Sequence, residues 1–202
     1  LSDIGISDRE WTDEELLENS IAKTEYLLEN LNHLKGKSYD IGFLTSREQK
    51  KNHIDNINKL KEKVSTKLKT PVSKVYFVND IDGNKNIDVT SSRKSKILLE
   101  HLIGYKIKNN RFVSLKQNVY ETVHFYDDIP ENIDGANNLQ FLFEKALIRT
   151  ESKLKQEILE RVKQNELKFI VNQITSNKLN PFIKFEHKIL SPNDIKLFED
   201  FE

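Results

Sequence analysis

Apolar residues recur at helical spacing in two stretches of the first seventy residues. In TDEELLENS, Thr12 and Glu15 have the spacing of a helix-capping box. Leu and Ile then recur at helical spacing until Gly36. A second such stretch begins at Ser46 and ends before Pro71. Because its apolar stripe is narrow, we expect a helical hairpin or coiled-coil arm over residues 1–70. The side chains expected to bind a protein partner are Leu17, Ile21, Leu28, Leu31, Ile54, Ile57 and Val64.

The hydrophobic pattern changes between residues 71 and 136. Short β-branched and aromatic runs alternate with turn residues, which is typical of strands. In GYKIKNNRFVSL, Asn109-Asn110 predicts a tight hairpin turn. We therefore expect a small antiparallel α+β head, with a helix near Arg93–Leu102. Its strands are expected at 75–78, at 87–89, on both sides of Asn109-Asn110 and at 119–126.

Residues 137–202 return to a helical pattern. Between residues 138 and 174 there is no Gly or Pro, and the apolar positions keep helical phase. This predicts one long helix, or two with a break near Asn165. The preceding DDIPENIDGANN is a predicted loop. A short strand at PFIKF and a terminal helix capped by Ser191 are expected to pack on the head.

Together these patterns predict a helix-dominated α+β fold. Long amphipathic helices, including a coiled-coil-like arm, would flank a small antiparallel sheet of about five short strands. The expected domains are the arm, the head, and the segment of the long helix, at 1–70, 71–136 and 137–202.

Composition narrows the chemistry. The chain has 37% hydrophobic and 32% charged residues, and it contains no Cys and no Met. Without Cys, disulfides, zinc–thiolate sites and thiol nucleophiles are excluded. The missing Met and the start at Leu1 indicate a fragment or a processed chain. No apolar run reaches the roughly 20 residues of a membrane span, and no cofactor motif is present. The compartment stays open, with an intracellular one favoured.

One acidic segment has the spacing of a calcium loop. Oxygen-bearing side chains stand at alternate positions around a turn, as calcium requires. However, Lys85 occupies the place of the central glycine, and Ser91 replaces the closing carboxylate. The pattern therefore favours a solvated hairpin turn, and the weak metal candidates are Asp80, Asp82, Asn84 and Asp88.

Arg47 and His53 form a second weak candidate site. In REQKKNH their spacing resembles the Arg-x4–6-His motif of HEPN ribonucleases, in which the two side chains flank a scissile phosphate. The motif is short, and it stands in a stretch rich in Lys and Arg. A residue on the helix surface is therefore the simpler interpretation of His53.

A basic cluster supports a different function. The net charge is zero, but residues 35–118 carry nineteen bases and eight acids. Tyr105 and Phe112 interleave with the cations, as stacking platforms do in single-strand binding. Only Glu100 opposes the cluster between residues 93 and 116. Its members are Arg93, Lys94, Lys96, Lys106, Lys108, Arg111 and Lys116.

From the sequence we favour a non-enzymatic protein–protein interaction or scaffold module of a larger assembly. Its partner would be another protein or a second copy, bound through the helices. The alternative is a nucleic-acid-binding subunit of a processing or defence complex, and a weaker one is a HEPN-like RNase. No cofactor is expected.

Overall fold

In the computed structural model the chain forms two compact units, Ile4–Lys85 and Asn86–Glu202. The predicted helix from Thr12 and the terminal helix from Ser191 lie outside the described residues. The structure describes residues 38–46, 51–78, 87–115, 120–164, 167–174 and 182–188.

The first unit contains a β–α–β arrangement. Strand β1 (Ile41–Thr45) pairs in parallel with β2 (Val72–Phe77), and Phe43 lies opposite Val75. Because parallel neighbours cannot be joined by a tight turn, a crossover must connect them. Helix α2 (Lys51–Leu68) provides that crossover and contacts β2.

The coiled-coil-like arm is therefore wrong for the described part of this unit. Its narrow stripe is buried in the structure, at Ile57, Leu60 and Val64. A stripe of this width is wide enough to cover a two-stranded sheet, so it does not by itself require a partner helix. The YDIGFL segment between the two predicted helices contains β1, which is one of the two strands of this sheet.

The second unit begins with α3 (Ile87–Ile103) and contains two sheets. One is the antiparallel hairpin β3–β4, and the other has the strand order β5–β6–β7. The remaining elements, in chain order, are β3 (Tyr105–Lys108), β4 (Arg111–Leu115), β5 (Thr122–Asp127), α4 (Pro130–Asn137), α5 (Leu139–Ile148), α6 (Ser152–Gln164), β6 (Lys168–Ile174) and β7 (Phe182–Lys188).

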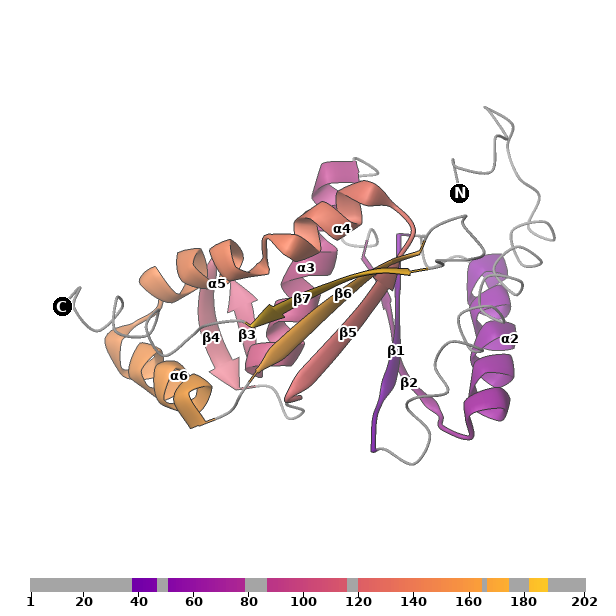
Figure 1. Cartoon of the computed structure of the whole chain (residues 1–202), viewed down its shortest axis with the longest axis horizontal. Helices are drawn as coiled ribbons and strands as arrows, with labels where there is room; N and C mark the ends of the chain where they lie inside the picture. The colour runs from indigo at the N-terminus through magenta and orange to yellow at the C-terminus, as the bar shows by residue number, and fades with distance from the viewer. Residues whose placement is uncertain are drawn as a thin grey trace. The chain divides into compact units, whose positions relative to one another are not determined.

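The central strand of the three-stranded sheet is β6, which runs parallel to β5 and antiparallel to β7. Both of its faces are buried, with Phe169 and Val171 on one side and Ile170 and Asn172 on the other. Helices α3 and α4 contact each other and β5, and α4 also contacts β6. The chain passes from β5 to β6 through three helices, α4, α5 and α6 (Figure 1).

The predicted five-stranded antiparallel sheet is wrong. Two of the strand pairings in the described residues are parallel, and the strands belong to three separate sheets. Residues 87–89 begin helix α3 where a strand was expected, and the predicted loop DDIPENIDGANN contains α4. The protein is thus a mixed α/β fold in its described part.

The prediction of one helix over 138–174, or of two with a break near Asn165, is also wrong. The structure has helices α5 and α6, separated at residues 149–151, and then the strand β6. Helix α5 ends at Ile148, and the Thr150 hydroxyl caps it by donating to the Ala146 carbonyl at 2.7 Å. The same Oγ1 accepts the Phe112 N–H at 3.0 Å, which joins this corner to β4. In β6, KFIVNQI is a short apolar run, and periodicity cannot separate a strand from a helix over such a length.

The hairpin around Asn109-Asn110 is confirmed. Both residues have positive φ, 52° and 56°, as a two-residue turn requires. Strands β3 and β4 flank this turn, and Phe112 contacts Phe143 of α5 with ring centroids 5.8 Å apart. Strands were also expected at 75–78, 119–126 and 181–185, where the structure has β2, β5 and β7.

Candidate functional site

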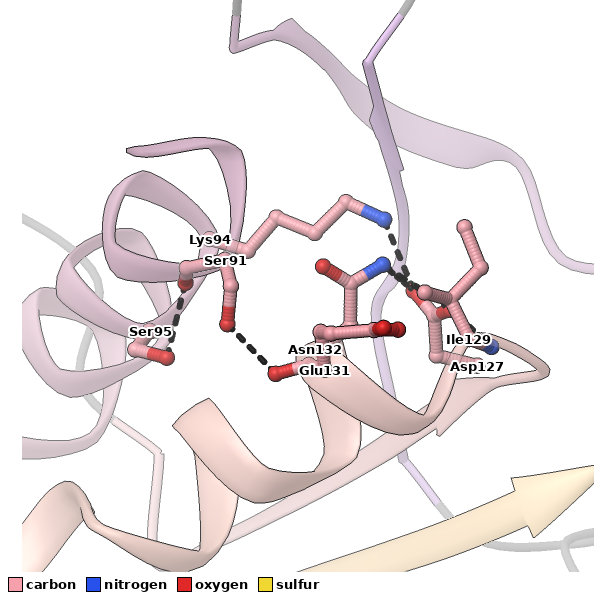
Figure 2. A network of polar contacts seen from close by, with 7 residues as sticks. All are labelled: Ser91, Lys94, Ser95, Asp127, Ile129, Glu131 and Asn132. Carbon is pink, nitrogen blue, oxygen red and sulfur yellow. Dashed lines mark hydrogen bonds and ion pairs between the residues drawn. The ribbon is translucent and has the colours of Figure 1, made fainter. Parts of the chain in front are cut away.

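Asp127 is the last residue of β5, at the carboxyl end of a parallel strand pair. It shares a face of the sheet with Phe125, because alternate residues of a strand point the same way. Its side chain meets Lys94 from α3 and Asn132 from α4 (Figure 2). In open α/β sheets, the carboxyl ends of the strands are where ligands bind.

Four hydrogen bonds converge on the Asp127 carboxylate. Lys94 Nζ donates to Oδ2 at 2.7 Å, and the side chains of this ion pair are only 6% and 8% exposed. Asn132 Nδ2 donates to both carboxylate oxygens at 3.1 Å, and the Ile129 N–H donates to Oδ1 at 2.9 Å. A carboxylate has about four acceptor positions, so Asp127 is saturated.

The local sequence explains this convergence. The bond from the Ile129 N–H to Asp127 turns the chain out of β5, which is a common use of Asp at a strand end. Ile129 is extended, with φ −89° and ψ 118°, as a residue before proline prefers. Pro130 then starts α4, and the first turn of that helix brings Asn132 back to the carboxylate.

Close packing of α3 on α4 fixes the position of Lys94. The Ser91 hydroxyl donates to the Glu131 carbonyl at 2.6 Å, and the Ser95 hydroxyl donates to the Ser91 carbonyl at 2.9 Å (Figure 2). Gly135 faces the two serines, and a Cβ atom there would overlap the Ser91 hydroxyl. The helices therefore approach closely because small residues meet at the crossing.

Two groups at this site retain hydrogen-bonding capacity. The Lys94 ammonium has three N–H donors and uses one of them, on Asp127, among the described residues. Asn132 is 1% exposed, and its Oδ1 has no hydrogen-bond partner. A buried acceptor without a hydrogen bond lowers the stability of the fold unless a ligand or a water molecule donates to it. The site thus offers a cation with open donors beside a buried acceptor.

The opposite face of β5 has different chemistry. Tyr126 stacks with His124 at a centroid distance of 6.4 Å, and burial raises the pKa of Tyr126 to about 12. The phenol therefore stays protonated at neutral pH and can act as a hydrogen-bond donor. Asn172 of β6 donates from Nδ2 to the Phe125 carbonyl at 3.3 Å, which satisfies one polar group on this buried strand.

The structure does not test the weak metal and RNase candidates. Asp80, Asp82, Asn84 and Arg47 lie outside the described residues, and Asp88 stands in the first turn of α3. His53 is half-buried in α2. Within the described ranges, no group of three or more His, Asp or Glu side chains could hold a metal ion.

Three of the predicted partner-binding residues lie within the described part of the chain, and four lie outside it. Ile57 and Val64 are buried and Ile54 is half-buried, all on α2. The other four, Leu17, Ile21, Leu28 and Leu31, lie outside the described residues.

The predicted basic cluster separates into two groups. Lys106, Lys108 and Arg111 are exposed on the hairpin, whereas Lys94 is buried against Asp127. Arg93 and Lys96 are half-buried on α3, and Lys116 lies outside the described part of the chain. Tyr105 and Phe112 are 7% and 1% exposed, so they are core residues and not stacking platforms.

Sequence reasoning missed Asp127 and Asn132. One signal was available in the sequence: Asp127 and Asp128 directly follow the alternating strand VYETVHFY. Side chains at the end of a strand lie at the edge of the sheet, where ligands often bind. Lys94 was identified, but as a surface phosphate contact. Its burial follows from the packing of α3 on α4, which the sequence pattern does not reveal.

None of the described helices combines the length and the apolar character that crossing a membrane requires. The chain matches no family model, no curated protein and no solved structure.

Proposed function

We propose that the chain binds a phosphate-bearing ligand at the carboxyl end of β5, through the ammonium group of Lys94. The observation that carries this proposal is the buried pair of Lys94 and Asp127, 2.7 Å apart, beside the partnerless Oδ1 of Asn132. Buried polar groups with open hydrogen-bonding capacity at the carboxyl end of a parallel strand are candidates for ligand binding.

The hydrogen-bonding groups that remain open at this site favour a phosphate ligand over a carboxylate ligand. Two Lys94 N–H donors can bind anionic oxygens, whereas Asn132 Oδ1 needs a donor. A phosphate monoester loses its last proton with a pKa near 6, and the form that keeps this proton carries both anionic oxygens and a hydroxyl. A carboxylate ion has no such donor. The N-terminus of α4, which begins at Pro130, adds a favourable potential for an anion.

Each residue then has a distinct role. Lys94 contacts the ligand and stabilises its negative charge in a region that excludes most water. Asp127 is a positioning residue, since its acceptor positions are already occupied by Lys94, Asn132 and the Ile129 N–H. Electrostatic stabilisation of this kind is the main requirement for chemistry on phosphate groups.

Calorimetric titration with inorganic phosphate tests the proposal. We expect saturable binding by the full chain and at least tenfold weaker binding of acetate. The double variant Lys94→Met/Asp127→Leu should lose phosphate binding while remaining folded by circular dichroism. Lys145→Met, which removes an exposed lysine of α5, should bind as the wild type does. Undiminished binding by the double variant, or equal binding of acetate, would contradict the proposal.

Protein–protein interaction remains a second candidate function, and one surface supports it. Phe141 and Ile148 of α5 are 66% and 67% exposed. They are seven residues apart, so they lie on the same side of the helix. Large apolar side chains exposed together on a helix favour association with another protein.

Sedimentation velocity of the chain alone tests this candidate for self-association. We expect the weight-average sedimentation coefficient to rise with concentration, and the rise to be abolished by Phe141→Glu/Ile148→Lys. Gln140→Glu, at an exposed neighbouring position, is the matched control. A concentration-independent monomer would remove the support for self-association.

A further inference from the structure

The hairpin β3–β4 has one apolar face and one basic face. Tyr105, Ile107 and Phe112 are buried, at 7%, 5% and 1% exposure. Lys106 and Lys108 alternate with the buried residues of β3 and are exposed. The buried face anchors the hairpin, so the exposed cations are carried on a rigid support. Glu100 of α3 fixes it further by accepting the Ile107 N–H at 2.9 Å.

Like charges are held opposite each other on this face. Lys108 pairs directly with Arg111 across the two-residue turn. Neither they nor Lys106 forms an ion pair with any residue that the structure describes. Like charges in directly opposed positions destabilise a sheet. An anionic partner would relieve this repulsion, which gives the arrangement a functional explanation.

The exposed cations define one surface of the hairpin. We call it the basic hairpin surface, and its members are Lys106, Lys108 and Arg111. The end of α5 lies against β4, because the Phe112 N–H donates to Thr150 Oγ1 at 3.0 Å. This contact further fixes the position of the hairpin.

We propose that the basic hairpin surface binds the phosphate backbone of a nucleic acid. A nucleic acid presents phosphates at regular intervals, which suits several cations on one rigid support. Because Tyr105 and Phe112 are buried, the described residues of the hairpin offer no platform for base stacking. Binding is therefore independent of the base sequence. This proposal does not rest on the Lys94 site.

Fluorescence anisotropy with the full chain and a labelled 20-nucleotide single strand tests this inference. With three phosphate contacts the affinity should fall about 20-fold between 50 and 200 mM salt, from a slope of about −0.7 per contact. In Lys106→Gln/Lys108→Gln/Arg111→Gln the dissociation constant should rise at least tenfold at 50 mM salt. The salt slope should also decrease nearly to zero. Lys51→Gln/Lys59→Gln/Lys67→Gln on α2 removes the same charge from exposed positions and should bind as the wild type does.

Three binding results would overturn the inference. The first is that the chain does not bind the strand at 50 mM salt, and the second is that both triple variants lose the same affinity. The third is that the chain binds poly-glutamate as tightly as the nucleic acid, which would indicate an acidic protein partner. The melting temperature distinguishes weaker binding from loss of folding. Because Arg111→Glu replaces a like-charge pair with an opposite-charge pair, this variant should have a higher melting temperature while it binds more weakly. A lower melting temperature in Arg111→Glu would contradict the repulsion on which the inference depends.

Discussion

Asp127→Leu is expected to lower the free energy of unfolding by about 3–5 kcal/mol, the range for breaking one half of a buried ion pair. The substitution leaves the Lys94 ammonium buried without its counter-charge. It also removes the acceptor of the Ile129 N–H and of Asn132 Nδ2, which fixes the turn into α4. Urea unfolding followed by circular dichroism measures the loss.

The matched experiment is the double variant Lys94→Met/Asp127→Leu. Replacing both partners of a buried ion pair by apolar groups leaves no uncompensated charge. We therefore expect the double variant to be more stable than either single variant, although still below wild type because two N–H groups lose their acceptor. Additive losses would show that the two side chains are not energetically coupled.

Gly135→Ala is expected to destabilise the protein by about 1–3 kcal/mol, the range for overpacking a closely packed contact. A Cβ atom at this position overlaps the Ser91 hydroxyl and lies 2.9 Å from the Ser95 hydroxyl. Both serines are buried and hydrogen-bonded, so they have little room to move. The loss should exceed the gain of about 1 kcal/mol that Ala normally provides over Gly in a helix.

Two comparisons isolate the cause of that loss. Glu131→Ala alters an exposed side chain of the same helix and should change the stability by less than about 0.5 kcal/mol. Ser91→Ala removes the overlapping hydroxyl, so Ser91→Ala/Gly135→Ala should be more stable than Gly135→Ala alone. If Gly135→Ala proves as stable as wild type, the close approach of α3 to α4 at this point is incorrect.

Some elements could be predicted because their signals are local. The Asn109-Asn110 turn depends on two residues that tolerate positive φ, and β5 on the alternation of VYETVHFY. The fold class could not be predicted from local signals, because parallel pairing joins strands that are far apart in the chain. Thr122 of β5, for example, pairs with Lys168 of β6. The run KFIVNQI fits a helical phase and a buried strand equally, and only its pairing with β5 decides between them.

The candidate site was harder to predict than the fold. Lys94 and Asp127 are 33 residues apart, and nothing in the sequence near either one indicates the other. The burial of Lys94 depends on Gly135, Ser91 and Ser95, small residues that carry no chemical signature in a sequence. By contrast, the exposure of Lys106 and Lys108 follows from strand alternation alone, so the basic hairpin surface was partly foreseeable.

The most direct test of the Lys94 site is a proton–nitrogen NMR correlation spectrum of the lysine ammonium groups, with and without inorganic phosphate. An ammonium held by a buried carboxylate exchanges its protons slowly enough to be visible, and Lys94→Met identifies its signal. We predict that this signal is present and shifts in a saturable way on addition of phosphate, and that chloride at the same ionic strength leaves it unchanged. A Lys94 signal that is visible but unaffected by phosphate would contradict the proposed function.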